Sequence, residues 1–374
     1  MPNEITGIVK RINNQTFVLR QMERSLRPGP QEIIIPTGLV RKCGLVQGAM
    51  IVGETQRQKG KTRVSKINTI CGLAPEAFQA RKSYSKLVAI DPEERFNLGE
   101  SGETGMRMID LIAPVGKGSR QLIVSPPKAG KTVMLEQIAL AIQAQSPESH
   151  TVVLLLDERP EEVTGFRRSV PESVDVLAST SDHSADEHAE LAELTLSLVQ
   201  TELECGKQVV LLIDSLTRIG RAFNNRIKGR SRHKGHTMSG GLESGVLEIP
   251  RRLFGLARNI ENGGSVTIIA TCLINTGSRM DQLIFEEFKG TGNSEIILDR
   301  NLAESRIFPA VDIPASGTRK ESRLYSEDES HGLTTLRRVL SSYSQRNAVV
   351  ALQKLMTRYS TNQAFLESMT AGAR

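Results

Sequence analysis

The sequence predicts an α/β fold, a P-loop nucleotide-binding domain built on a parallel sheet, preceded by a small all-β barrel. Two observations support this. Apolar runs alternate with helical stretches from about residue 106 onward, and short β-prone runs separated by turns fill the first 72 residues. A chain of 374 residues is long enough for two domains with separate cores. We therefore divide it into a barrel (1–72), a linker (73–105) and an α/β domain with C-terminal helices (106–374).

The barrel is predicted from five β-prone runs, at residues 5–12, 16–20, 31–36, 49–54 and 62–69. Five short strands in about 70 residues fit a Greek-key barrel such as the OB-fold, of the cold-shock kind, which often binds single-stranded nucleic acid. An SH3-like barrel, or a barrel with a purely structural role, would give a similar pattern.

The barrel carries most of the positive charge. Residues 1–72 hold 12 Lys and Arg against 4 Glu and no Asp, a surplus of +8, whereas the rest of the chain carries −2. A basic domain on a nearly neutral body favours a polyanion partner, although a merely solvated surface would have the same charge. Phe17 is the only aromatic residue here, whereas OB grooves normally stack bases on aromatic rings. RNA binding by the barrel is therefore expected to depend on phosphate charge and to weaken steeply with salt.

The α/β domain is predicted from continuous apolar strands separated by amphipathic helices, which is typical of a parallel sheet covered on both faces. We expect strands at residues 120–124, 151–158, 208–215 and 265–274, and helices at 133–144 and 186–203. The preceding segment mixes Pro, Gly and charge, as a linker that wraps onto the next domain would. Residues 347–369 predict amphipathic helices that pack within the subunit.

Composition argues against several classes of protein. The longest apolar runs, such as 266–274, are far shorter than the roughly 20 residues that span a bilayer, and the N-terminus lacks the pattern of a secretory signal. We therefore expect a cytoplasmic protein with no membrane partner. The cysteines lack C-x-x-C spacing, so they indicate neither a zinc site nor a disulfide framework. We expect them to be small buried apolar side chains: Cys43, Cys71, Cys205 and Cys272.

The motif SPPKAGKT, which ends at Thr132, predicts a phosphate-binding loop, although serine replaces the usual first glycine. It lies between an apolar strand and a helix expected to start at Thr132, which is the setting such a loop requires. Because Pro126 and Pro127 have no N–H group, the phosphate donors must be the backbone amides of residues 128–132. Lys131 would neutralise phosphate charge, and the Thr132 hydroxyl would hold Mg²⁺. A chance G-K-T at a helix start is the alternative.

Acidic residues follow two of the apolar strands. Asp214 ends a buried strand that we expect to lie next to the loop strand, where a Mg²⁺-linked carboxylate is needed. Asp157 and Glu158 end another strand and would place a carboxylate where it orients a water on the γ-phosphate. A helix-capping role is the alternative for Asp214. Together with the lysine loop, these acids favour an ATP and Mg²⁺ site.

Five segments together resemble the Rho family of transcription termination factors, which are hexameric RNA-dependent ATPases of the RecA-like class: SPPKAGKT, LLLDERPEEVTGF, LLIDSLTRIGRAFN, EEFKGTGN and IFPAVDIPASGTRKE. The resemblance runs almost without a break from about residue 106 to 321, and weakly through 1–72. The family's loop has the form A-P-P-K-A-G-K-T, so the missing glycine is a family feature. The resemblance implies an RNA-dependent ATPase with 5′-to-3′ helicase activity, a homohexameric ring on single-stranded RNA, and transcription machinery, including RNA polymerase, as a partner.

The resemblance also implies roles for individual residues. Glu158 corresponds to the catalytic glutamate, Arg159 to a phosphate-sensing arginine, and Phe308 to an aromatic that stacks on adenine. Arg319 corresponds to an arginine finger offered to the neighbouring subunit's ATP, so hydrolysis is expected to need ring assembly. The implied catalytic set is Glu158, Lys131, Arg319 and Arg159. The implied metal-linked residues are Thr132 and Asp214, and the implied nucleotide-binding residues are Lys128, Ala129, Gly130, Lys131, Thr132, Val133 and Phe308.

Two loops are implied to grip RNA in the central pore of the ring. The first, within 224–241, is longer and more basic than is usual in the family, and its charges suit phosphate contacts without base readout. The second, at 275–281, has arginine where the family usually has lysine. With Phe17 of the barrel, the implied RNA-binding residues are Arg226, Lys228, Arg230, Arg232, Lys234, Arg279 and Lys289. Ile34 lies near the position of a base-stacking tyrosine, so we expect no strong pyrimidine preference.

Sequence reasoning alone leaves two rival functions. A related hexameric ATPase that moves protein or protons would share the phosphate loop. Stimulation of ATP hydrolysis by RNA would distinguish the RNA-dependent ATPase implied by the resemblance from this rival. A catalytically idle RNA-binding scaffold is the second rival, and any turnover would remove it.

Overall fold

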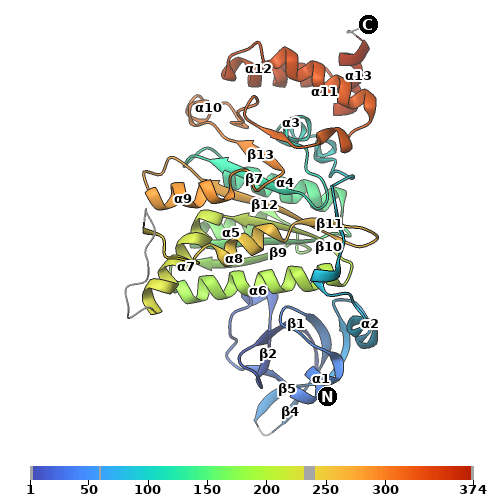
Figure 1. Ribbon diagram of the computed structural model, residues 1–374, viewed down its shortest axis with the longest axis vertical. Coiled ribbons are helices and arrows are strands. Elements are labelled where there is room, and N and C mark those ends of the chain that lie inside the picture. Colours follow the sequence, from blue (N-terminus) through green and yellow to red (C-terminus); the bar gives the residue numbers. More distant parts are fainter. Residues whose placement is uncertain (1–2, 59, 231–240, 372–374) are drawn as a thin grey trace.

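The computed structural model describes residues 3–58, 60–230 and 241–371. A small barrel lies at one end, a large sheet covered by helices occupies the middle, and a group of helices forms the other end (Figure 1). The chain passes through these three parts in sequence order, from the blue barrel to the red helices.

In the described part of the chain, five strands close the N-terminal barrel in the order β1-β2-β3-β5-β4. Their bounds are β1 Asn3–Arg11, β2 Phe17–Arg20, β3 Ile33–Ile35, β4 Met50–Gln58 and β5 Lys61–Ile70. Side chains alternate along each strand, so Val9, Ile51 and Val64 point inward and are buried. Each predicted run is a strand, which confirms the OB-like barrel. A short helix missing from the prediction, α1 (Thr37–Cys43), follows β3.

The central sheet contains parallel strands in the order β13-β7-β12-β10-β8-β9. Their bounds are β7 Arg120–Ser125, β8 His150–Glu158, β9 Asp175–Thr180, β10 Gln208–Asp214, β12 Ser265–Leu273 and β13 Ser294–Ile297. The two-residue β14 (Gly317–Thr318) adds an antiparallel edge beside β13. Antiparallel β11 (Arg258–Ile260) pairs with β12 and with β6 (Ala89–Ile90). The predicted parallel α/β sheet is therefore confirmed.

One expectation about strand order is wrong. The strand that ends in Asp214, β10, is not next to the loop strand β7, because β12 pairs with both and lies between them. Hydrophobic patterning identifies strands but does not order them, since the order depends on where each crossover connection returns to the sheet.

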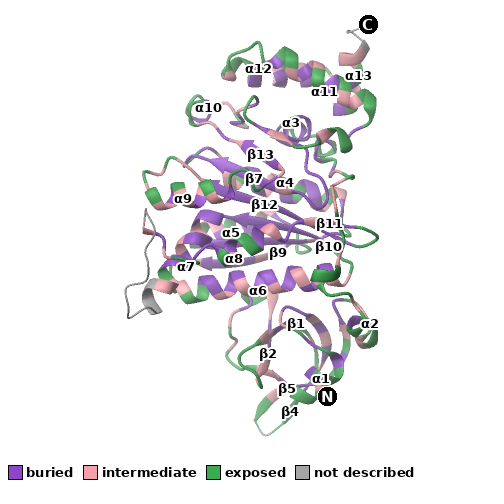
Figure 2. Cartoon of the chain, in the orientation of Figure 1, coloured by how far each residue is buried: buried purple, intermediate pink, exposed green. Residues whose placement is uncertain are grey.

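Helices cover both faces of the sheet. Ile123 of β7 packs in the core with α3 (Thr104–Ile112), α4 (Lys131–Gln145) and α5 (Pro160–Ser169). Its neighbours Leu122 and Val124 point to the other face. The helices of that face are α6 Ala185–Glu204, α7 Leu216–Arg230, α8 Glu248–Gly255 and α9 Arg279–Phe288. The strands are consequently buried almost throughout, as the purple centre of Figure 2 shows.

The segment between barrel and sheet is ordered and wraps onto both. It contains α2 (Pro75–Gln79), short 3-10 turns and β6. Phe78 is buried in the barrel core, whereas Phe96 and Leu98 are buried in the core of the α/β domain. Wrapping of this segment, as predicted, therefore fixes the barrel to the sheet.

The C-terminal helices pack within the subunit, as predicted. They are α10 Arg300–Glu304, α11 Glu327–Leu340, α12 Gln345–Met356 and α13 Asn362–Ala371. Buried residues such as Leu336, Leu352 and Phe365 join the core of α3 and α4.

The barrel rests on α6. Lys10 forms an ion pair with Glu190 at 2.8 Å, and Gln47 donates a hydrogen bond to the Ser197 hydroxyl at 3.1 Å. Gly48 lies so close that a Cβ there would be 2.2 Å from the Ser197 carbonyl carbon, so only glycine fits. The barrel therefore packs directly against α6.

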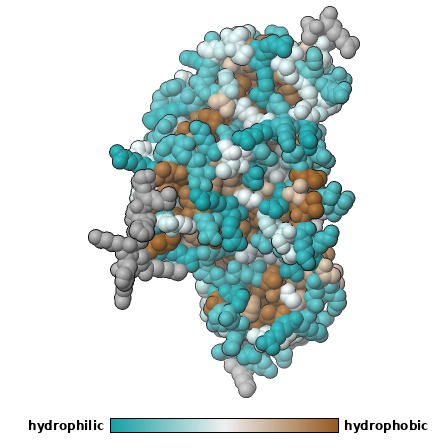
Figure 3. All heavy atoms as spheres, viewed as in Figure 1, coloured by the Kyte–Doolittle hydropathy of each residue, from teal (hydrophilic) through white to brown (hydrophobic). Residues whose placement is uncertain are grey.

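The helices and the surface were compared with what a membrane-spanning segment requires. Among the described residues no helix is long and apolar enough to cross a bilayer. The face shown in Figure 3 is mainly hydrophilic, with apolar residues in small groups.

Candidate active site

The phosphate loop connects β7 to α4 at the carboxyl edge of the sheet. Gly130 precedes α4 with φ 91°, and Lys128 has φ 65°. These left-handed residues turn the chain sharply before the helix begins at Lys131, one residue earlier than predicted. A helix N-terminus with free amide groups is a ready site for phosphate. Ser125 in place of the first glycine, and the two prolines after it, do not prevent this geometry.

A cluster of polar side chains surrounds the Asp214 carboxylate, which is fully buried at the end of β10. Lys131 Nζ lies 2.6 Å from both Asp214 oxygens. The Thr132 hydroxyl donates to Oδ2 at 3.0 Å, and the Thr271 hydroxyl of the intervening strand donates to Oδ1 at 2.8 Å. The loop lysine, the loop threonine and the strand-end aspartate predicted from sequence thus meet at one point.

Glu158 faces the same cluster from the end of β8. It is 2% exposed, and its Oε1 lies 3.8 Å from Lys131 Nζ without a hydrogen-bond partner among the described residues. Arg218 donates to its Oε2 at 3.0 Å. Burial, helped by the nearby Asp214 charge, raises the pKa of Glu158 to about 7. A carboxylate with a free oxygen and a pKa near neutrality is suited to accept a proton from water.

A pocket of about 440 Å³ opens beside the loop, between α4 and the segment that follows α10. Phe308 (47% exposed) and Val133 (59% exposed) line it, and the Phe308 ring is within 3.6 Å of where a Gly130 Cβ would be. Exposed apolar side chains next to a phosphate loop suit one flat aromatic base. Lys128, Ala129 and Gly130 also line this pocket, so the predicted nucleotide-binding residues lie together.

Two predicted arginines lie apart from this cluster. Arg159 is exposed at the start of α5, directly after Glu158. Arg319 is exposed after β14, and its backbone N–H donates to the Asn293 carbonyl at 2.7 Å. Because Thr318 pairs with Ser294 at the amino end of β13, Arg319 lies at the sheet edge opposite the phosphate loop. It therefore cannot reach the ATP site of its own subunit.

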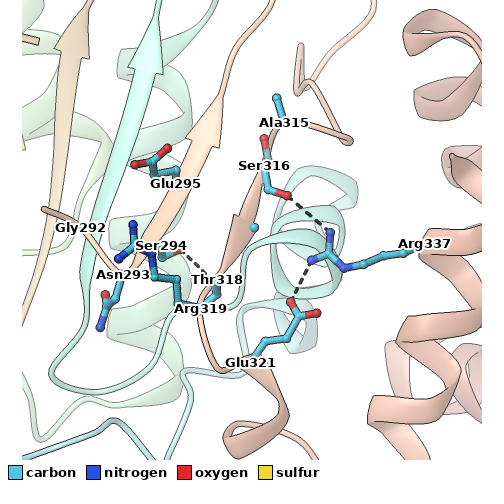
Figure 4. Close-up of a pocket in the computed structure, with 11 residues that line it drawn as sticks. Gly292, Asn293, Ser294, Glu295, Ala315, Ser316, Thr318, Arg319, Glu321 and Arg337 are labelled. Carbon is cyan, nitrogen blue, oxygen red and sulfur yellow. Dashed lines mark hydrogen bonds and ion pairs between the residues drawn. The ribbon is translucent and has the colours of Figure 1, made fainter. Parts of the chain in front are cut away.

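Arg319 lines a second hollow, of about 340 Å³, at that edge. Figure 4 shows Arg319 beside Asn293 and Thr318, with Glu321 and Arg337 across the hollow. Glu321 and Arg337 are paired at 2.8 Å. Among the described residues, the one hydrogen bond of the Arg319 guanidinium is to the Gly290 carbonyl, at 3.4 Å. The Arg319 guanidinium therefore faces solvent with little contact to the rest of the described chain.

The predicted RNA-binding residues have different surroundings. Arg279 and Lys289 are exposed at the two ends of α9, and Phe17 packs partly buried against the barrel core. Arg226 is held by ion pairs to Asp186 at 3.0 Å and to Glu193 at 2.6 Å, both on α6. Arg232 and Lys234 lie outside the described residues, as do the side chains of Lys228 and Arg230 at the end of α7.

Three residues at the site were missed by sequence reasoning. Thr271 lies in an apolar strand and nothing marks it. Arg218 and Arg221 follow Asp214 on α7, where Arg218 contacts Glu158 and Arg221 forms a bidentate pair with Asp281. The i, i+3 spacing of two arginines on a helix that starts beside the acid was the available signal.

The fold and this site define a nucleotide-binding domain of the ATP synthase alpha/beta class. Residues 105–318 match the model of the ATP synthase alpha/beta family, nucleotide-binding domain. A solved structure of an ATPase from the type III secretion system of pathogenic bacteria has the same fold, with a TM-score of 0.63 and 23% identity, over 77% of this chain and 89% of that one.

The chain belongs to the family of transcription termination factor Rho. It is 44% identical to the Rho factor of Chromobacterium violaceum over 359 residues, 94% of this chain and 84% of that protein. It is 42% identical to the Rho factor of Aquifex aeolicus, over 98% of this chain and 85% of the relative. Against the Rho factor of Streptomyces lividans, 44% identical over 369 residues, it matches 97% of its own length but about half, 51%, of the relative.

Proposed function

We propose that this protein is an RNA-stimulated ATPase that assembles as a homohexameric ring and terminates transcription by moving along nascent RNA in the 5′-to-3′ direction. The observation that carries the proposal is the meeting of Lys131, Thr132 and Asp214 beside the unpaired oxygen of Glu158. Membership of the Rho family supplies the process, and RNA polymerase is the expected partner machinery.

The residues present fit Mg²⁺-ATP. The Thr132 hydroxyl and the Asp214 carboxylate are hard oxygen donors within 3.0 Å of each other, the kind that Mg²⁺ prefers. The bound ion would neutralise charge on the phosphates. Lys131 leaves Asp214 to contact the outer phosphates, and Phe308 stacks on the base.

Hydrolysis needs a base and a stabiliser of transition-state charge. Glu158 orients the attacking water and takes its proton, while Arg218 holds the carboxylate in place. Arg319 of the neighbouring subunit supplies positive charge at the γ-phosphate, a contribution typically worth about 10³–10⁵ in rate. Because Arg319 lies at the edge away from its own loop, turnover depends on the ring.

RNA would contact the protein at two separate places. The barrel with its +8 charge offers a first, sequence-tolerant contact. Arg279, exposed at the start of α9, offers a second contact in the ring, together with the basic residues within 224–241, part of which lie outside the described residues.

The test is steady-state ATP hydrolysis with and without poly(C), poly(U) and mixed-sequence RNA. Glu158→Gln should abolish turnover, whereas Glu161→Gln, a change at an exposed carboxylate three residues later in the first turn of α5, should keep it. Stimulation by RNA supports the proposal. Turnover indifferent to every RNA would instead favour a ring ATPase with another cargo, and absence of turnover would favour a binding scaffold.

A further inference from the structure

Two cysteines that are 134 positions apart in the sequence meet where the barrel joins α6. Cys71 follows β5, the last barrel strand, and is 2% exposed. Cys205 caps the end of α6, is partly exposed and packs against the barrel core that contains Cys71. Both thiols are free.

The surrounding contacts hold the two segments together independently of the thiols. Gly72, next to Cys71, lies so close to Lys207 that a Cβ there would be 3.0 Å from its Nζ. Arg81 of the linker is paired with Glu204 at 3.0 Å. The segments that carry Cys71 and Cys205 are therefore held against each other by packing and charge on both sides.

We propose that Cys71 and Cys205 form a redox modification site, at which a two-electron oxidant such as hydrogen peroxide links them in an intrachain disulfide that ties the barrel to the nucleotide-binding domain. The inference is independent of the proposed function, because it rests only on this pair of thiols.

The chemistry divides the two sulfurs into an attacking and a resolving one. The partly exposed Cys205 thiolate attacks one peroxide oxygen, the O–O bond breaks, and Cys205 becomes a sulfenic acid as hydroxide leaves and takes up a proton. The Cys71 sulfur then attacks the Cys205 sulfur, the S–S bond forms, and the sulfenic oxygen leaves as water with the Cys71 proton. In total, two thiols lose two hydrogens and one peroxide is reduced to two waters.

The electrostatics fit these roles. The neighbouring Cys71 thiol lowers the pKa of Cys205, against the opposing effect of burial, and Arg81 lowers it further. The neighbouring Cys205 thiol and burial raise the pKa of Cys71. Cys205 is thus the thiol that ionises first, as an attacking thiol must.

The other two cysteines are natural controls. Cys43 and Cys272 are buried, and burial raises the pKa of each thiol. Cys272 contacts the Thr217 hydroxyl at 3.4 Å. Neither is placed to compete for the oxidant.

The experiment uses the reduced full chain, freed of reductant, treated with hydrogen peroxide and then alkylated under denaturing conditions. We expect the free thiols to fall from four to two and the unalkylated mass to fall by about 2 Da. Trypsin places every cysteine in a different peptide, so the expected product joins residues 67–81 to residues 169–207. Reductant should reverse the link.

Cysteine-to-serine variants test which residues form the link. Cys43→Ser with Cys272→Ser should keep the link, and Cys205→Ser should remove it. Cys71→Ser should instead leave Cys205 oxidised by about 16 Da, the added oxygen of a sulfenic acid. Four thiols remaining after peroxide, a link through Cys43 or Cys272, or disulfides only between chains would each overturn the proposal. The wild-type peptide map decides even if a variant does not fold.

Discussion

Arg221 on α7 holds Asp281 at the start of α9 in a bidentate ion pair, with Nε 2.8 Å from Oδ1 and Nη2 2.5 Å from Oδ2. Asp281 is 1% exposed and also accepts the Thr276 hydroxyl at 2.6 Å. One turn earlier on the same helix, Arg218 contacts Glu158. The helix that begins beside the candidate ATP site therefore also fixes the start of α9, where Arg279 lies.

We expect Arg221→Ala to lower the stability of the fold and to weaken the stimulation of ATP hydrolysis by RNA. Removing the guanidinium leaves a buried carboxylate without its cation, a loss of about 1–3 kcal/mol in the free energy of unfolding for a pair that is partly open to water. RNA stimulation of turnover should fall more than basal turnover. Denaturant melts and ATPase assays measure these effects. Arg279→Ala, an exposed change, should reduce RNA stimulation without loss of stability, and equal melts of both variants would contradict the role of the pair.

Phe308→Ala should weaken binding of ATP but not of inorganic tripolyphosphate, because the ring is placed for the base and not for the phosphates. Loss of a stacking contact is worth about 1–2 kcal/mol, so the Kd for ATP should rise by roughly tenfold. Calorimetric titration with each ligand measures this. Thermal stability should hardly change, since Phe308 is half exposed. An equal loss of affinity for both ligands would show that Phe308 instead shapes the phosphate loop.

The pKa of Glu158, raised to about 7 by burial and by Asp214, predicts a pH profile. Its carboxylate must be ionised to accept a proton, so kcat/KM for ATP should rise about tenfold per pH unit below about pH 7 and level off above it. The raised pKa means that the folded chain binds this proton more tightly than the unfolded chain. This carboxyl therefore lowers stability as pH rises from about 4.5 to 7, and Glu158→Gln should remove that part of the slope.

His150 predicts a loss of stability at alkaline pH. Burial alone would lower its pKa, but Glu202 at 2.6 Å and Asp175 at 2.8 Å outweigh burial and raise the pKa to about 10. A raised histidine pKa gives stability that is complete below about pH 6.5 and is lost as pH rises toward 10. Over this pH range, the free energy of unfolding of the wild type should fall by up to about 4 kcal/mol more than that of His150→Gln. Parallel curves for the two proteins in denaturant melts across this range would refute it.

Mixing two inactive variants tests Arg319. Lys131→Ala and Arg319→Ala should each be inactive alone. In a mixed ring, an intact Lys131 on one subunit can face an intact Arg319 on the next, so turnover should partly return. If mixtures stay as inactive as either parent, while sedimentation shows that mixed rings form, Arg319 does not act between subunits.

Much of the fold followed from local patterns. Short β-prone runs separated by turns gave the barrel strands, unbroken apolar runs gave the parallel strands, and a helix at 186–203 was expected where α6 spans Ala185–Glu204. The phosphate loop and the acids at strand ends were found because their chemistry needs fixed residue types at short spacing.

The remaining features depend on distant parts of the chain. Thr271 reaches Asp214 only because β12 inserts between β7 and β10, and strand order is not encoded in periodicity. Arg226 was predicted to face RNA, yet it is paired with α6, a contact that requires knowing which helices are neighbours. Cys71 and Cys205 meet for the same kind of reason.

The position of α6 between the barrel and the sheet affects how the protein unfolds. Ile8 and Leu26 of the barrel segment belong to the same hydrophobic cluster as Leu198 of α6 and Leu211 of the sheet. Ser25, fully buried, accepts hydrogen bonds from Arg167 and from the backbone of Ala178 on β9. Both the barrel and the α/β domain pack against α6. Unfolding either of these two halves would therefore expose apolar surface of the other. The two halves should therefore unfold as one cooperative unit, and the barrel keeps a fixed orientation relative to the central sheet while the protein stays folded.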